Sequence, residues 1–175
     1  GLLAKENTIT FLAVIPLTLY FFTNAKLKDH IIILIPMFIS TIIYMIIRYQ
    51  ALGFIFTEVK IAEILNDPFI NSPPGEKYAT VIYTWLIYLK LLIFPHPLTH
   101  DYYPMQIPYM NFSDIRAIAS LLIFLALIVY AIVNLKKKSV ISYGILFFLI
   151  TFSILSNLVF NIGTFMNERF MFVPL

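Results

Sequence analysis

The chain has 175 residues, of which 61% are hydrophobic and 12% are charged, whereas soluble domains carry about 25% charged residues. This composition leaves too little polar surface to cover a globule, so it excludes a soluble fold and indicates an integral membrane protein. The net charge of +3 is too small to indicate a nucleic-acid partner. The absence of cysteine excludes a disulfide framework, a thiolate metal site and a cysteine nucleophile.

Long apolar segments recur along the chain and predict helices, because only a helix satisfies all of its own backbone hydrogen bonds in lipid. We therefore expect an all-α, polytopic transmembrane protein with about five apolar segments and two long outer loops. The segments cover residues 9–22, 31–47, 78–94, 115–135 and 140–160. A span needs about 20 apolar residues, within a range of about 17–25. The second, fourth and fifth segments meet this requirement, whereas the first is short and the third contains Lys90.

Four connections between these segments differ sharply in character. Residues 23–30 and 136–138 form short basic loops, and short basic loops favour the cytoplasmic face. Residues 49–77 and 95–114 form long loops that contain several prolines. Long loops in compact proteins tend to be functional or disordered, so we expect the long pair to carry function.

The two basic loops create a conflict of topology. Three apolar segments lie between them, so three full crossings would put the loops on opposite faces. In one alternative, segment 78–94 is re-entrant and both long loops lie on the outer face together with Glu168 and Arg169. In the other, all five segments cross and one basic loop departs from the charge rule.

Charged residues border the first two apolar segments. Lys5 and Glu6 precede the first segment, where a carboxylate near the start of a helix is favourable and where the pair could also line a polar cavity. Arg48 ends the second segment, where it could extend its guanidinium to the interface or bind a lipid phosphate.

His96, His100 and Asp101 lie close together in the loop of residues 95–114. This grouping could bind a divalent ion, but a metal site would need a further ordered ligand and a means of holding the spacing. Histidines in loops are mostly without such a role, and we expect no metal here.

Glu168 and Arg169 form the strongest candidate site. They follow an apolar segment and precede another apolar run, which puts both charges near the membrane surface. Ionisable groups there are costly, which makes them a functional-site hypothesis. A structural ion pair is the alternative.

Five short motifs occur in the same order as in a known family, and they cover nearly the whole chain. They are Lys5-Glu6; Asn66-Asp67-Pro68 with Lys77 and Thr80; Pro95, Leu98, Asp101-Tyr102 and Ile107-Pro108; Asp114-Ile115-Arg116; and Asn157-Leu158, Phe160, Gly163, Glu168-Arg169 and Val173-Pro174. On these motifs the chain resembles the transmembrane and tetratricopeptide-repeat (TMTC-type) proteins, a branch of the C-type glycosyltransferases.

The resemblance implies that residues 1–175 belong to one polytopic membrane domain cut from a longer enzyme. It implies a catalytic carboxylate in an outer loop before Gly1 and tetratricopeptide repeats after Leu175. The implied activity is transfer of a sugar, of mannosyl type, from a polyprenyl-phosphate donor to a hydroxyl of a protein or glycan. The alternatives are a transporter or flippase of lipid-linked sugars, and a non-catalytic membrane anchor for a repeat domain.

The resemblance also implies roles for particular residues. Arg169 would bind the donor phosphate, with Lys5 and Arg48 as further cations. Glu168 would hold Arg169 in place, and Glu6 and Asp101 would support the site. We expect membrane lipid, the lipid-linked donor and the acceptor as partners, and no cofactor. The membrane would be the bacterial inner membrane, or that of the endoplasmic reticulum.

Overall fold

The computed structural model describes residues 2–3, 5–53, 68–70, 72–99, 102, 106–158 and 162–174, and for Glu6 the backbone alone. Within these residues the chain is all-helical and forms no strand. The elements are η1 (Glu6–Thr10), α1 (Phe11–Phe22), α2 (Leu27–Leu52), α3 (Pro74–Ile93), α4 (Ile115–Val133), η2 (Leu135–Lys137), α5 (Val140–Ser153) and η3 (Glu168–Phe172).

Polar residues at the helix ends explain where the helices begin and stop. At the start of α2 the Asp29 carboxylate accepts the Lys26 backbone N–H at 2.8 Å, and the helix ends at Gly53, whose φ of 78° suits a glycine. Asp114 caps α4 by accepting the Arg116 N–H at 2.9 Å. Helix α3 begins with Pro74, which has no N–H to leave unpaired.

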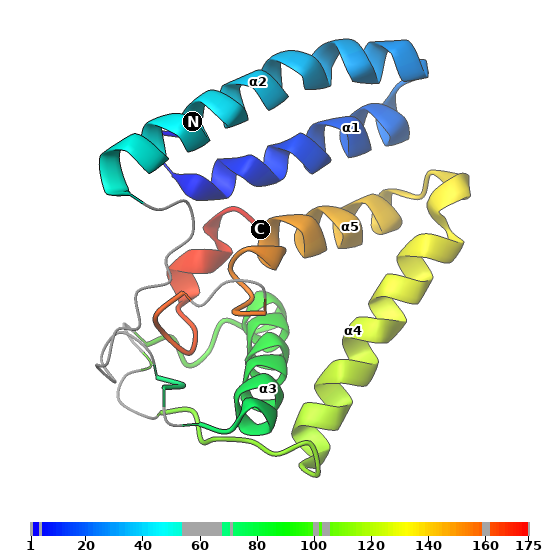
Figure 1. The fold of residues 1–175 in the computed structure, drawn as a ribbon. Coiled ribbons are helices and arrows are strands. Elements are labelled where there is room, and N and C mark those ends of the chain that lie inside the picture. The colour runs from blue at the N-terminus through cyan, green and yellow to red at the C-terminus, as the bar shows by residue number, and fades with distance from the viewer. Residues whose placement is uncertain are drawn as a thin grey trace.

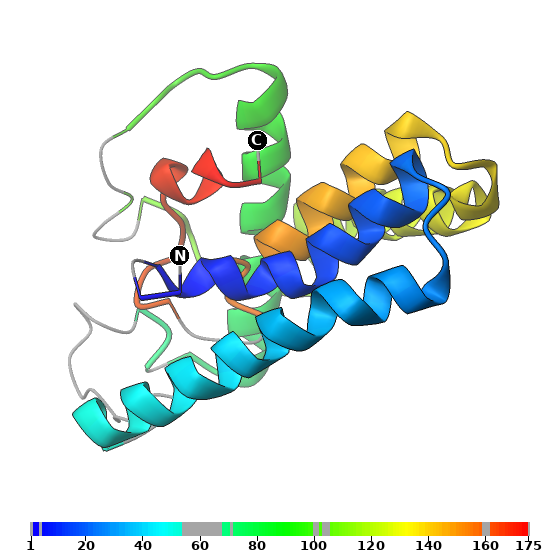
Figure 2. The same ribbon diagram turned by 90° about the horizontal axis from the view of Figure 1, so that it is seen from above.

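The helices form two groups that meet at α5. Helix α1 packs between α2 and α5, and these three run alongside one another (Figure 1). Helix α4 packs against both α5 and α3, and α3 stands at a steep angle to α1 in both ribbon views (Figure 2).

The largest hydrophobic core surrounds α3. Aromatic rings from three helices meet there: the Trp85 ring centroid lies 5.1 Å from that of Phe124, and the Tyr88 centroid lies 5.2 Å from that of Phe152. The segment that precedes η3 adds Phe165 to this core. Helix α2 contributes no buried residue.

Two of the described helices are long and apolar enough to cross a membrane, namely α2 and α4. The apolar helices α1 and α5 are shorter, and α3 does not qualify. The prediction that residues 140–160 form a long span is wrong in its end point, because α5 stops at Ser153. The chain turns there: Asn157 has a φ of 58°, which interrupts any helix.

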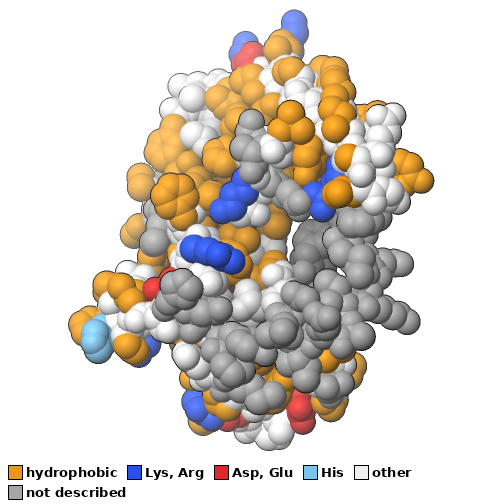
Figure 3. All heavy atoms as spheres, turned by 90° about the vertical axis from the view of Figure 1, so that its left-hand side faces the viewer, with side chains coloured by type: hydrophobic (Ala, Val, Ile, Leu, Met, Phe, Trp, Pro, Cys, Tyr) orange, Lys and Arg blue, Asp and Glu red, His pale blue; other side chains and the backbone are white. Residues whose placement is uncertain are grey.

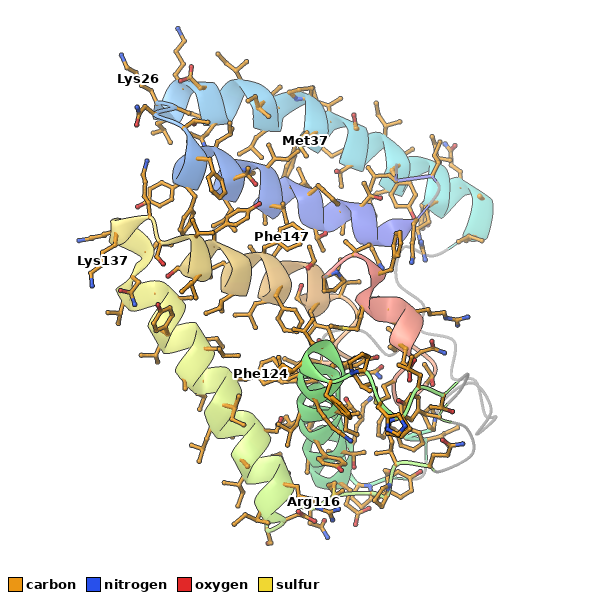
Figure 4. The ribbon with its side chains drawn as sticks, turned by 180° about the vertical axis from the view of Figure 1, so that it is seen from behind. Lys26, Met37, Arg116, Phe124, Lys137 and Phe147 are labelled. Atoms are coloured by element: carbon orange, nitrogen blue, oxygen red, sulfur yellow. The ribbon has the colours of Figure 1, made fainter. Side chains whose placement is uncertain are left out.

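The two basic loops lie at one end of the molecule. Lys138 Nζ donates a hydrogen bond to the Thr23 carbonyl at 3.2 Å and lies 5.3 Å from the Tyr20 ring centroid. Figure 4 shows Lys26 and Lys137 at the same end. The chain thus leaves this end along α2 and returns to it along α4. Helix α3, which contains most of segment 78–94, runs across α1 and not alongside it.

Candidate functional site

The segment after α5 is attached to α3 by two aromatic side chains. Trp85 Nε1 donates to the Ser156 carbonyl at 3.0 Å. The Tyr88 hydroxyl donates to the Asn167 carbonyl at 3.1 Å and accepts the Asn167 N–H at 2.8 Å. Tyr88 is only 1% exposed, so both bonds lie away from solvent. This pairing fixes the backbone immediately before Glu168.

Asn157 holds the turn between α5 and that attachment point. Its Nδ2 donates to the carbonyls of Thr164 at 2.7 Å and Phe165 at 3.1 Å, and its Oδ1 accepts the Ile162 N–H at 2.8 Å. Asparagine tolerates the positive φ of this position better than most residues. One side chain therefore satisfies three backbone groups of the turn.

Glu168 joins η3 to the long loop that follows α3. Its Oε1 accepts the Thr99 backbone N–H at 2.8 Å and the Tyr102 hydroxyl at 3.1 Å. Burial, and secondarily the hydrogen bond to Glu168, raises the pKa of Tyr102 to about 12. The carboxylate thus holds the loop that follows α3.

Arg169 is exposed, and no hydrogen bond or ion pair joins its side chain to Glu168 in the part of the chain that the structure describes. Its backbone N–H donates to Asn167 Oδ1 at 3.1 Å, and its guanidinium lies 5.5 Å from the Phe170 ring centroid. Among the described residues, the only ion pair joins Arg116 to Asp114, at 2.8 Å. The backbone of Arg169 is therefore held in place, and its guanidinium has N–H donors available to an anion.

The other two predicted phosphate-binding residues lie at the same end of the molecule as η3. Lys5 immediately precedes η1 and is exposed, and Arg48 Nη1 donates to the Tyr44 hydroxyl at 2.9 Å. The start of α1, the end of α2 and η3 all lie opposite the basic loops (Figures 1 and 2). Figure 3 shows several Lys or Arg side chains on this face, among hydrophobic ones.

Some predicted residues cannot be compared with the structure. Asp101 and His100 lie outside the described residues, as does the Glu6 side chain, whereas His96 is exposed. The part of the chain that the structure describes holds no group of three or more residues able to bind a metal.

An apolar pocket that sequence reasoning did not predict lies beside Glu168. Its volume is about 190 Å³, and it is lined by the end of α3, the loop after it and η3. The lining residues are Leu91, Leu92, Pro95, Leu98, Glu168 and Met171. Glu168 is the only charged residue among them and the lining is otherwise apolar, so the pocket suits an apolar group.

The attachment residues Trp85 and Tyr88 were also missed. They are three positions apart on α3 and both carry a polar atom on a buried ring, which usually finds a hydrogen-bond partner. Their polar atoms were the available signal in the sequence, although the sequence does not show which residue is the partner of each.

No family model, curated protein or solved structure matches this chain.

Proposed function

We propose that the chain belongs to a polytopic integral membrane protein in which α2 and α4 cross the bilayer. The support is that α2 is largely apolar between His30 and Arg48 and has no buried residue, so water is an unfavourable surrounding for it. The large exposed hydrophobic side chains of α4 support the same environment. Helices α1 and α5 would complete the membrane part, and the face that carries η3 would lie outside.

We propose further that this protein is a glycosyltransferase that takes a sugar, of mannosyl type, from a polyprenyl-phosphate donor. The observation that carries the proposal is the exposed guanidinium of Arg169 on a backbone held by Tyr88 and Asn167. A planar guanidinium can grip two phosphate oxygens at once, and such charge-assisted bonds are strong. The order of motifs shared with the TMTC-type proteins supports the same assignment.

In the proposed reaction, an acceptor hydroxyl oxygen of a protein or glycan forms a bond to the anomeric carbon. The bond from that carbon to the phosphate oxygen breaks, and its electron pair leaves with the lipid phosphate. A carboxylate outside residues 1–175 would take the hydroxyl proton. Arg169 would stabilise the charge that develops on the phosphate, with Lys5 and Arg48 adding positive potential.

The test compares purified full-length protein with the variants Arg169→Gln and Arg169→Lys in donor-titrated transfer assays. Removing one donor to a developing charge costs about 10²–10³ in rate, and we expect a loss of this order for Arg169→Gln. Arg169→Lys should recover part of it, because lysine is a point charge without the fork. Arg116→Gln is the matched control, because Arg116 is exposed but already paired with Asp114.

Unchanged kinetics in both Arg169 variants would remove this residue from the site. Movement of the lipid-linked sugar across vesicles without transfer to any acceptor would identify a flippase instead.

A further inference from the structure

Two loops that are far apart in sequence form one basic surface. Loop 23–30 brings two exposed lysines and the segment after α4 brings three: Lys26, Lys28, Lys136, Lys137 and Lys138. The hydrogen bond from Lys138 Nζ to Thr23 ties the loops together. Asp29 is the only acidic residue of these loops, so the five lysines outnumber the single carboxylate. The surface therefore has a positive net charge.

This surface lies at the border of the apolar helices. Helix α2 begins at Leu27 and α4 ends at Val133, and both ends expose large aliphatic side chains. Two exposed tyrosines lie at the same level, Tyr20 in the last turn of α1 and Tyr130 in the last turn of α4. Tyrosine is enriched where a membrane protein passes through the headgroup region.

We propose that this end of the molecule binds the headgroups of anionic phospholipids. The five ammonium groups match the phosphate charge, and the aliphatic and tyrosine border matches the adjoining acyl chains. A free anion or a nucleic acid would bind the ammonium groups but would leave the aliphatic and tyrosine border exposed to water. The inference rests on the proposed membrane location of α2 and α4, and it is independent of sugar transfer.

The inference also assigns an orientation. Anionic lipids are concentrated in the cytoplasmic leaflet, and lysines near that surface are attracted to it. The basic end would therefore lie on the cytoplasmic side, and η3 would lie on the opposite side of the bilayer. Both loops contribute to the same contact, so removing the lysines of either loop should weaken it.

The experiment measures the preference for phosphatidylglycerol over phosphatidylcholine at this end. Full-length protein in a cysteine-free background receives one cysteine at Ser139, which is labelled with a fluorophore and reconstituted in bilayer nanodiscs. Quenching by brominated phosphatidylglycerol, compared with brominated phosphatidylcholine, gives the ratio of the two binding constants. The variants are Lys26→Gln/Lys28→Gln, Lys136→Gln/Lys137→Gln and all four changes together.

Lys138 stays unchanged, because its bond to Thr23 belongs to the fold. The matched control is Lys77→Gln/Lys90→Gln, which removes two lysines of α3.

We expect the unmodified protein to prefer phosphatidylglycerol and each double change to lower that preference at least about threefold, given the attraction expected for each lysine. The four changes together should bring the ratio close to one, and so should 1 M salt, where the screening length is about 3 Å. The control should keep the original ratio.

Three outcomes would overturn the inference. One is a ratio near one in the unmodified protein. Another is an equal loss in the control, which would indicate a general effect of charge. The third is loss of the preference when inorganic phosphate is added at constant ionic strength, which would identify a site for any anion. None of these outcomes affects the transfer assay on Arg169.

Discussion

The two ends of the molecule use charged and polar side chains in opposite ways. At the basic end, the lysines are exposed, and a hydrogen bond from Lys138 to Thr23 joins the two basic loops. At the end that carries η3, buried groups fix the backbone, and Tyr88 alone makes two hydrogen bonds to Asn167. Exposed charge contacts contribute about 0–1 kcal/mol, whereas leaving a buried polar group unpaired costs about 1–3 kcal/mol. The first end suits a broad contact with a surface, and the second suits positioning of one ligand.

The largest expected effect is all-or-none labelling that separates the two ends. Single cysteines at Ser72 and Gln106 should react with an impermeant thiol reagent from one side of sealed vesicles, and a cysteine at Ser139 from the other side. The reason is that the loops of residues 49–77 and 95–114 would both face outward if α3 does not cross. Reaction of Ser72→Cys and Gln106→Cys from different sides would mean that α3 crosses the membrane.

The next effect concerns the stability of the two ends. Tyr88→Ala removes a buried ring and its hydroxyl, and such changes typically cost about 3–5 kcal/mol of unfolding free energy. Tyr20→Ala at the basic end removes a ring that is 37% exposed, and its cost should stay within about 1 kcal/mol. Unfolding in detergent by denaturant measures both. Similar losses of unfolding free energy in the two variants would show that the two rings contribute equally to stability.

Tyr88→Phe separates the hydroxyl from the ring. It leaves the Asn167 N–H and carbonyl without their partner, so we expect a loss of about 1–3 kcal/mol. A neutral Tyr88→Phe would assign the stability of this end to ring packing alone.

The smallest effect depends on pH and concerns Tyr102. Its pKa is about 12, raised from an ordinary 10.0 by burial and by the bond to Glu168, so the folded protein favours the neutral phenol. The resulting stabilisation is fully present below pH 10 and is lost as the pH rises through 12. The unfolding midpoint of the unmodified protein should therefore fall more steeply over this range than that of Tyr102→Phe.

Tyr20→Phe is the matched change at the other end of the molecule. If the midpoint of Tyr102→Phe falls as steeply as that of the unmodified protein, burial and the bond to Glu168 do not raise the pKa of Tyr102 in the folded protein.

Sequence patterns predicted the helices better than their ends. The start of the apolar segment 115–135 coincides with the start of α4 at Ile115, where Asp114 caps the helix. The end of α5 was missed because residues 154–160 remain largely apolar, while the turn depends on three side-chain bonds of Asn157. Such bonds reach along the chain in a way that hydrophobicity does not reveal.

The candidate site could be predicted only in part from the sequence, for the same reason. Glu168 and Arg169 stand out as charges in an apolar chain, so their importance could be predicted. Their partners could not, because Thr99 and Tyr102 come from a loop more than sixty residues away in sequence. Adjacent opposite charges suggested a pair, whereas the described bonds of the Glu168 carboxylate go to Thr99 and Tyr102.

Within the two helices proposed to cross the membrane, the stretches without charged residues or histidine have the same length. One is residues 31–47 of α2, between His30 and Arg48, and the other is residues 117–133 of α4, after Arg116 and up to the end of the helix at Val133, so each stretch has 17 residues. At the rise of an α-helix this is about 26 Å, which is shorter than the roughly 30 Å of an average hydrocarbon layer. Tilting would further reduce the bilayer thickness that each stretch spans. In such a layer either the surrounding lipid thins to meet both helices or flanking side chains such as Arg48 extend to the interface, which makes acyl-chain length a physical variable in how this protein sits in its membrane.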